Sequence, residues 1–228
     1  MTRRCAFLWT VVMLAGCARE ERPAAPAEPA GSAENAAPAR SDSRPVIVAF
    51  GDSLTAGHGV EPGLSYPDFL QKELDRRGYG YRVVNQGISG DTTGGGVARV
   101  NAAVSLRPTV VILELGANDG LRGLPVEATR SNLADMIVAF HRAGAKVVLC
   151  GMTLPRNYGP EYIRSFEAVF RDLAREKKTP LVPFFLEGVA MRQDLMQPDA
   201  LHPTARGNAI VAENVLKYLE PLLKRSPG

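Results

Sequence analysis

Short apolar runs alternate with amphipathic segments along residues 45–228, and this alternation constrains the fold more than any other feature of the chain. Buried strands are expected at Val46–Phe50, Tyr81–Val84, Thr109–Leu115, Lys146–Cys150 and Leu181–Phe185. Helical spacing lies between them, over residues 66–77, 97–106, 127–142, 161–176 and 204–219. Strands that alternate with helices predict an α/β protein, here a three-layer α/β/α sandwich around a five-stranded parallel sheet.

Polar residues follow three of the predicted strands at the point where each strand ends. Ser53 follows the first strand, Gly87 the second and Asn118 the third. Right-handed crossovers place the carboxyl ends of parallel strands at one edge of the sheet, where open α/β sheets bind their ligands. We therefore hypothesise that Ser53 is a catalytic nucleophile and that the neighbouring loops supply its partners.

A serine hydroxyl is a weak nucleophile and needs a base, for which the chain offers three histidines. His202 is the best candidate, because Asp199 stands three residues earlier and can accept its Nδ1 proton in a tight turn. Nε2 is then free to take the serine proton. His141 lies outside the apolar stripe of a helix, whereas His58 is loop-borne and could contact substrate. Taken alone, Asp-x-x-His-Pro also fits a helix N-terminus capped by Thr204.

Acyl transfer also needs hydrogen-bond donors for the oxyanion of the tetrahedral intermediate. The candidates are the backbone N–H groups of Ser53 and Gly87 and the side-chain amide of Asn118. A plain turn is the alternative for Gly87, and a turn or helix cap is the alternative for Asn118. We expect Asp52 and Asp119 to fix loops by hydrogen bonds rather than to react.

Other chemistries lack their sequence signatures. The chain has no Gly-x-x-x-x-Gly-Lys-Ser/Thr phosphate loop, no His/Cys cluster with metal-ligand spacing and no run of Lys and Arg, and its net charge is +3. We therefore expect no cofactor, no metal, no nucleic-acid partner and a monomer. Cys150 ends an apolar strand and is predicted to be a small core residue. Glu114 lies in the most apolar strand and should have a buried partner.

The N-terminal part of the chain carries signals of export. Two arginines precede an apolar segment that ends in Leu-Ala-Gly-Cys17, which resembles the lipobox of bacterial lipoproteins. We expect a signal peptide over residues 1–16, a lipid on Cys17 and a disordered Ala/Pro-rich tether over residues 17–44. Ala18 favours the outer membrane, on its periplasmic side. The alternative is an ordinary secretory signal with an incidental cysteine.

Four sequence blocks together resemble the GDSL, or SGNH, hydrolases. The blocks are Gly-Asp-Ser-Leu at 51–54, Asn-x-Gly-x-Ser-Gly-Asp-Thr-Thr at 85–93, Gly-x-Asn-Asp at 116–119 and Asp-x-x-His at 199–202. They occur in the order and spacing of that family, and the match extends from Pro45 to about Leu223. The resemblance implies the flavodoxin-like fold of SGNH hydrolases for residues 45–228. It also implies a triad of Ser53, His202 and Asp199, with an oxyanion hole from Ser53, Gly87 and Asn118.

Further segments resemble the bacterial thioesterase I and lysophospholipase type within this superfamily, among them Leu154–Gly159 and Pro183–Glu187. This implies hydrolysis of aryl esters, acyl thioesters and lysophospholipids of broad acyl chain length. The implied walls of the acyl groove are Tyr66, Gly94, Gly95, Leu154 and Tyr158, with a mobile glycine run at 94–96. Core packing or loop rigidity is the alternative for Tyr66, Leu154 and Tyr158.

The lipid anchor bears on the substrate, because it would hold the enzyme at a membrane surface where acyl-CoA is not expected. A lysophospholipid or fatty ester is then the expected natural substrate. Two alternatives remain open at this point. One is a narrow O-acetylesterase that acts on cell-envelope sugars, and the other is a lipoprotein that binds lipid without catalysis.

Overall fold

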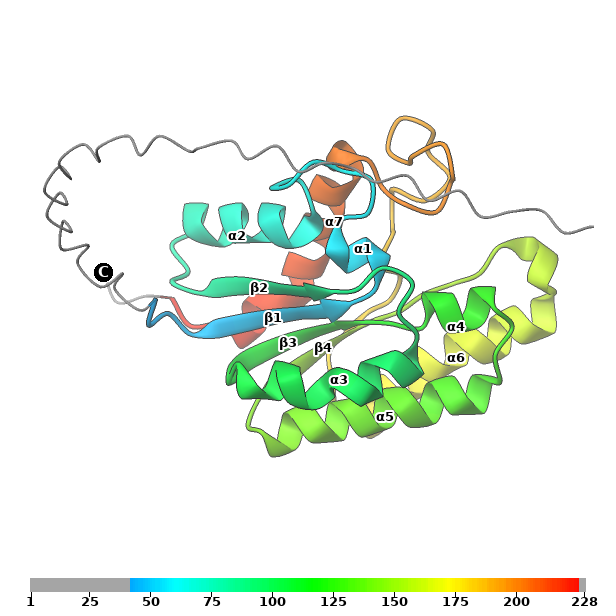
Figure 1. Cartoon of the computed structure of the whole chain (residues 1–228), viewed down its shortest axis with the longest axis horizontal. Helices are drawn as coiled ribbons and strands as arrows, with labels where there is room; N and C mark the ends of the chain where they lie inside the picture. Colours follow the sequence, from blue (N-terminus) through cyan, green and yellow to red (C-terminus); the bar gives the residue numbers. More distant parts are fainter. Residues whose placement is uncertain (1–41, 226–228) are drawn as a thin grey trace, which may run out of the picture. The chain divides into compact units, whose positions relative to one another are not determined.

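The computed structural model describes residues 42–225, which form a five-stranded, all-parallel sheet with helices on both faces (Figure 1). The strand order is β2-β1-β3-β4-β5. The strands are β1 (Val46–Gly51), β2 (Arg82–Gly87), β3 (Pro108–Glu114), β4 (Lys146–Cys150) and β5 (Leu181–Val182). This arrangement confirms the predicted three-layer α/β/α fold with a five-stranded parallel sheet.

The long helices form the two outer layers. Helices α2 (Tyr66–Arg76) and α7 (Ala205–Leu219) pack together on one face, and α3 (Thr93–Ser105), α5 (Val126–Arg142) and α6 (Pro160–Glu176) cover the other (Figure 1). Two short helices follow the carboxyl ends of strands: α1 (Ser53–Ala56) after β1 and α4 (Ala117–Leu121) after β3. Two 3₁₀ turns complete the described residues, η1 (Arg156–Tyr158) and η2 (Glu220–Leu222).

The sheet is most completely buried at its centre. All six residues of β1 are buried, and β3 beside it is buried at six of seven positions. β1 is apolar along its whole length, and β3 is apolar from Val110 to Leu113, because helices cover both faces of a parallel sheet. Each fully buried aliphatic side chain there stabilises the fold by roughly 1.5–3 kcal/mol. The carboxyl ends of β1 and β3 are therefore held rigidly, and the loops that follow them start from fixed positions.

Several element boundaries differ from the sequence prediction. β2 continues to Gly87, three residues beyond the predicted end, so Gly87 is a strand residue and not part of the following loop. β5 stops at Val182 because Pro183 has no N–H to continue the ladder, although the N–H of Phe185 still donates to Gly151 O at 2.9 Å. Helices α1 and α4, of four and five residues, are too short to show helical periodicity in the sequence.

The expected signal peptide, the expected lipidation site Cys17 and most of the expected tether lie outside the described residues. Among the described residues, the last three of the predicted tether, 42–44, are exposed. No helix within residues 42–225 is both long enough and apolar enough to cross a membrane.

Candidate active site

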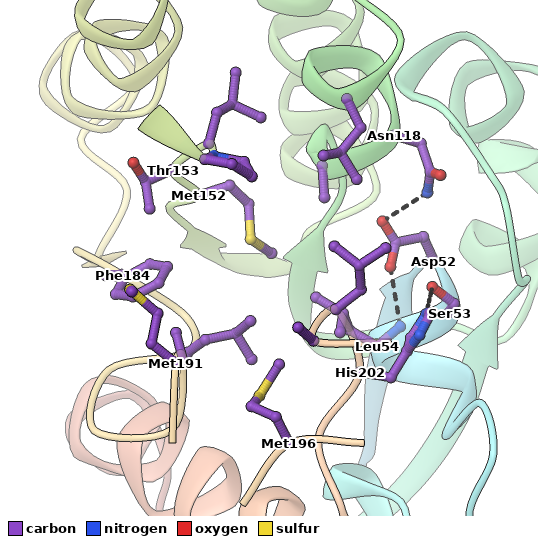
Figure 2. A pocket seen from close by; sticks show the side chains of 18 of the residues that line it. Asp52, Ser53, Leu54, Asn118, Met152, Thr153, Phe184, Met191, Met196 and His202 are labelled. Atoms are coloured by element: carbon purple, nitrogen blue, oxygen red, sulfur yellow. Dashed lines mark hydrogen bonds between the residues drawn. The ribbon is translucent and has the colours of Figure 1, made fainter. Parts of the chain in front are cut away.

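Ser53, His202 and Asp199 form a continuous hydrogen-bonded series at the carboxyl edge of the sheet. Figure 2 shows the part of it that joins Ser53 to His202. Ser53 is the first residue of α1, directly after β1. Its Oγ lies 2.8 Å from His202 Nε2, and His202 Nδ1 lies 2.6 Å from Asp199 Oδ2. The structure thus brings together residues separated by 149 positions in the sequence, in the order that the sequence analysis expected.

The Asp199 carboxylate is held by more than the imidazole. Its Oδ1 accepts the N–H groups of Leu201 at 2.9 Å and His202 at 3.0 Å. Partial burial works to raise the pKa of Asp199, but the hydrogen bonds from the His202 ring and from these two N–H groups outweigh it and lower the pKa to about 2. Asp199 is therefore ionised at neutral pH and fixes the orientation of the ring.

The loop that carries His202 is tied down on both sides. Gln197 Nε2 donates to the carbonyl oxygens of His58 at 2.7 Å and Pro203 at 2.9 Å. Thr204 caps α7, accepting the N–H of Gly207 at 3.3 Å. The helix-cap interpretation of this segment was therefore right for Thr204, and it coexists with the contact between His202 and Ser53. The His58 ring lies against the His202 ring, with centroids 4.5 Å apart.

The prediction that Gly87 donates to an oxyanion is wrong for this structure. Gly87 belongs to β2, its N–H donates to Asn85 Oδ1 at 2.9 Å, and it does not line the cavity described below. Gly90, three residues later, does line that cavity beside Ser53 and has a φ of 80°, which favours glycine. Within residues 42–225, the N–H groups of Gly90 and Ser53 have no protein acceptor.

The sequence signal for Gly90 was available in the same block, because Ser89-Gly90-Asp91 lies one residue beyond the end of β2. Because the second strand was predicted to end at Val84, Gly87 was assigned to the following loop. The extra strand residues carry Gly87 back into the sheet and leave Gly90 as the glycine of the turn.

Asn118 lies at the site, but both of its amide hydrogens have acceptors. Nδ2 is 3.1 Å from Asp52 Oδ2, a contact marked in Figure 2. It also lies 2.9 Å from the carbonyl oxygen of Asp91. Burial raises the pKa of Asp52 to about 6, against the opposing effect of hydrogen bonds from Leu54 N–H and Asn118. Asp52 caps α1 and links it to Asn118, which agrees with its predicted loop-fixing role. Asn118 must release one hydrogen bond before it can donate to a substrate oxygen.

Asp119 also has the structural role that was predicted. Its carboxylate accepts the backbone N–H of Thr93 at 2.9 Å and the hydroxyl of the same residue, which joins α4 to the start of α3. Asp119 is 2% exposed. It therefore fixes the helix that carries Asn118 and does not itself reach the cavity.

Glu114, for which the sequence named no partner, lies beneath the nucleophile. Its Oε2 accepts the hydroxyl of Thr55 at 2.6 Å and the N–H of Asp52 at 3.3 Å, and its Oε1 has no partner among the described residues. Complete burial and the neighbouring Asp52 carboxyl raise the pKa of Glu114 well above its ordinary value. Burial therefore favours the neutral form of this carboxyl, which lies beneath the turn that presents Ser53. Tyr66 and Cys150 are buried close by.

A cavity of about 1150 Å³ opens beside Ser53 and His202. Its walls are mostly apolar side chains from the loops after β4 and β5 and from the segment that leads to His202: Met152, Leu154, Phe184, Leu186, Met191 and Met196 (Figure 2). Helix α4 adds Ala117 and Leu121. Most of these residues were not predicted from the sequence, because single apolar side chains in loops carry no periodic signal.

Of the five predicted groove residues, only Leu154 lines the cavity. Tyr66 is fully buried in the core, where its ring packs edge-on against Phe185 at 5.1 Å. Gly94 and Gly95 belong to the first turn of α3 and do not reach the cavity, because Asp119 anchors this helix start. Tyr158 is turned away and donates its hydroxyl to Leu121 O at 2.7 Å. These four assignments were wrong, whereas the core-packing alternative for Tyr66 was right.

No group of three His, Cys, Asp or Glu side chains within residues 42–225 is arranged to hold a metal ion. Cys150 is fully buried, as the sequence analysis expected of a core residue. Burial raises the pKa of its thiol. Among the residues that line the cavity, Ser53 supplies a hydroxyl and His202 and His58 supply imidazoles.

Comparison with known proteins gives consistent results. Residues 49–210 match the GDSL-like Lipase/Acylhydrolase family. The chain is 46% identical to the esterase TesA of Pseudomonas aeruginosa over 178 residues, which cover 78% of this chain and 89% of that protein. It is 36% identical to thioesterase 1/protease 1/lysophospholipase L1 of Escherichia coli strain K12, covering 78% and 84% of the two chains.

A crystal structure of TesA matches the fold with a TM-score of 0.76 at 46% identity, over 78% of this chain and 99% of that one. The family match spans more than half of the chain and contains Ser53, Gly90, Asn118 and the Asp199–His202 segment. It also agrees with the family resemblance read from the four sequence blocks. The chain therefore belongs to the GDSL-like lipase/acylhydrolase family, and it is a serine hydrolase that acts on ester bonds.

Proposed function

We propose that this enzyme hydrolyses carboxylic esters and thioesters over a broad range of acyl chain lengths through a covalent acyl-Ser53 intermediate. The observation that carries the proposal is the 2.8 Å contact between Ser53 Oγ and His202 Nε2 at the side of a large apolar cavity. The contact supplies an activated nucleophile, and the cavity supplies a place for the acyl chain.

In the first step, Ser53 Oγ attacks the carbonyl carbon while its proton passes to His202 Nε2. The π pair of the carbonyl moves onto the oxygen, which becomes an oxyanion. The imidazolium that forms is stabilised by ionised Asp199, which lies 2.6 Å from Nδ1. When the intermediate collapses, the bond to the leaving oxygen or sulfur breaks and His202 returns the proton to the leaving group.

Backbone donors stabilise the oxyanion in this mechanism. Ser53 and Gly90 line the cavity, and their N–H groups have no competing acceptor within residues 42–225. Asn118 can add a third hydrogen bond if it leaves one of its two present acceptors. Loss of a single donor of this kind typically costs about 100- to 1000-fold in kcat.

Deacylation repeats the steps with water. His202 takes a proton from a water molecule as the water oxygen attacks the acyl carbon of acyl-Ser53. Collapse releases the carboxylic acid and returns the proton to Ser53 Oγ. No group beyond the residues of the site and one water molecule is needed, so the reaction balances without a metal or cofactor.

The size and apolar lining of the cavity favour acyl chains longer than acetyl. Relatives are named esterase, arylesterase and thioesterase/lysophospholipase, and the same range of substrates is proposed here. Hydrolysis rates of p-nitrophenyl esters from acetate to palmitate test the proposal, with Ser53→Ala as the control. Useful rates over several chain lengths, lost in Ser53→Ala, support it. A steep preference for acetate alone would instead indicate a narrow acetylesterase.

We also propose that the enzyme is exported and held at a membrane by a lipid on Cys17. The sequence support is the Leu-Ala-Gly-Cys17 segment after two arginines and an apolar run. The full-length chain and its Cys17→Ser variant would be compared by membrane fractionation. Release of Cys17→Ser into the soluble fraction supports the anchor, whereas retention of the variant with the membranes contradicts it.

A further inference from the structure

Arg99 of α3 makes contacts with the ends of both strands that flank the site. Its Nη1 donates to the carbonyl oxygen of Gln86 in β2 at 2.8 Å, and its Nη2 donates to that of Gly51 in β1 at 2.9 Å. Its Nε lies 2.7 Å from Asp91 Oδ2. A single guanidinium therefore joins the strand before Ser53 to the strand and turn that carry Gly90.

The guanidinium also stacks on the aromatic ring of Phe50. Its central carbon lies 3.9 Å from the centroid of the Phe50 ring, and the Arg99 side chain is only 17% exposed. A planar, desolvated guanidinium with three acceptors in fixed directions is a rigid connection, which a lysine ammonium cannot reproduce. Arg99 does not line the cavity, so it has no direct contact with substrate.

The turn that contains Gly90 is fixed through the same contacts. Asp91, which follows Gly90, is paired through its carboxylate with Arg99 and through its carbonyl oxygen with Asn118. Gly51 O accepts the N–H of Ile88 at 3.1 Å as well as Arg99. Arg99 therefore links the two segments that carry the N–H groups of Gly90 and Ser53.

We propose that Arg99 is a positioning residue that fixes the relative position of the two backbone donors of the oxyanion hole, the N–H groups of Gly90 and Ser53. This inference rests on the proposed function, in which the N–H groups of Gly90 and Ser53 bind the oxyanion. Misplacement of a catalytic group by about 1 Å can cost about 100-fold in rate. Substitution of Arg99 should therefore weaken stabilisation of the transition state and leave binding of the ground-state ester unchanged, because the oxyanion exists only in the transition state and the intermediate.

The first test compares Arg99→Lys with Arg130→Lys on p-nitrophenyl butyrate. Arg130 is a matched control, because it is also paired with a carboxylate, that of Glu176 at 2.6 Å, but lies outside the site. We expect Arg99→Lys to lower kcat by about 10- to 100-fold with KM within about twofold, and Arg130→Lys to leave both within about twofold. An unchanged kcat in Arg99→Lys, or a rise in KM alone, would overturn the inference.

A second measurement separates positioning from general loss of structure. Butylboronic acid forms a tetrahedral adduct with a nucleophilic serine, and its inhibition constant should rise in Arg99→Lys by the same factor as kcat/KM falls. Methylguanidinium added to Arg99→Ala should restore activity, whereas methylammonium should not. If the boronate binds Arg99→Lys and the unmodified enzyme equally well, or if both cations rescue alike, Arg99 is not a positioning residue.

Failure of the inference can be told apart from failure of the proposed function. If Ser53→Ala loses activity while Arg99→Lys keeps it, the serine mechanism stands and the role of Arg99 is refuted. If Ser53→Ala retains hydrolysis, both fail together.

Discussion

Replacement of Glu114 by Gln tests whether the buried Glu114 carboxyl beneath the Ser53 turn is neutral in the folded protein. Glu114 is fully buried, and its Oε2 accepts hydrogen bonds from Thr55 and Asp52 while Oε1 has none within residues 42–225. Its pKa in the folded protein lies well above the ordinary value of 4.5, first because of burial and then because of the Asp52 carboxyl. Gln keeps the shape and the acceptor oxygen, but it has no proton to lose.

The sign and size of the effect follow from proton linkage. Above pH 4.5 the unfolded chain releases the Glu114 proton while the folded chain keeps it. Folding stability that is fully present below pH 4.5 is therefore lost as the pH rises toward the folded pKa, by about 1.4 kcal/mol for each pH unit. The amide of Gln adds a cost of about 1–3 kcal/mol for unpaired donors, but this cost does not change with pH.

The assay is urea unfolding of both proteins at several pH values between 5 and 8. As the pH rises, the free energy of unfolding of Glu114→Gln should increase relative to that of the unmodified protein by about 1.4 kcal/mol for each pH unit. Glu161→Gln, at an exposed position of α6, controls for general charge effects and should change stability by less than about 0.5 kcal/mol at every pH. A stability difference between Glu114→Gln and the unmodified protein that does not vary with pH would show that Glu114 is not held neutral.

Three further substitutions test the site. Asp199→Asn should lower kcat/KM by about 1000- to 10,000-fold with little change in thermal stability, because the amide cannot stabilise the imidazolium; a loss under tenfold would contradict its role. Gly90→Ala should reduce kcat while costing only about 1 kcal/mol of stability. Gly87→Ala should destabilise the fold strongly, because its Cβ would clash with the backbone of Ala56; equal stability losses would refute this distinction. Ala190→Trp, inside the cavity, should lower the rate on long-chain esters relative to acetate, by about fourfold per methylene group displaced; an unchanged chain-length profile would remove the acyl chain from this cavity.

The sequence predicted the parts of the molecule that depend on periodic burial. The fully apolar strand of residues 46–50 and the amphipathic helix of residues 127–142 have strong periods, so both were found with small boundary errors. The topology rule for parallel strands then placed Ser53 and Asn118 at the same edge. The short spacing from Asp199 to His202 was enough to suggest their contact, and the structure has it at 2.6 Å.

Features that depend on tertiary packing could not be predicted from periodic patterns in the sequence. Gly87 was chosen over Gly90 because the extent of β2 is set by its pairing with β1, and its own polar sequence gives little sign of that pairing. Tyr66 was predicted to line the groove, because the sequence around an aromatic residue near the site fits a groove wall as well as a core position. Only its contact with Phe185 in the structure shows that it is a core residue. The long-range contacts of Arg99 and Glu114 join segments tens of residues apart, so no local pattern could predict them.

The central claim is that Ser53, activated by His202, forms the covalent bond to the acyl group. Diethyl p-nitrophenyl phosphate reacts with activated serines, and peptide mass spectrometry locates the label. We expect complete inactivation with one diethylphosphoryl group on the peptide that contains Ser53, and no labelling of His202→Ala on the same timescale. A label on another residue, or full activity in a protein labelled at Ser53, would contradict it.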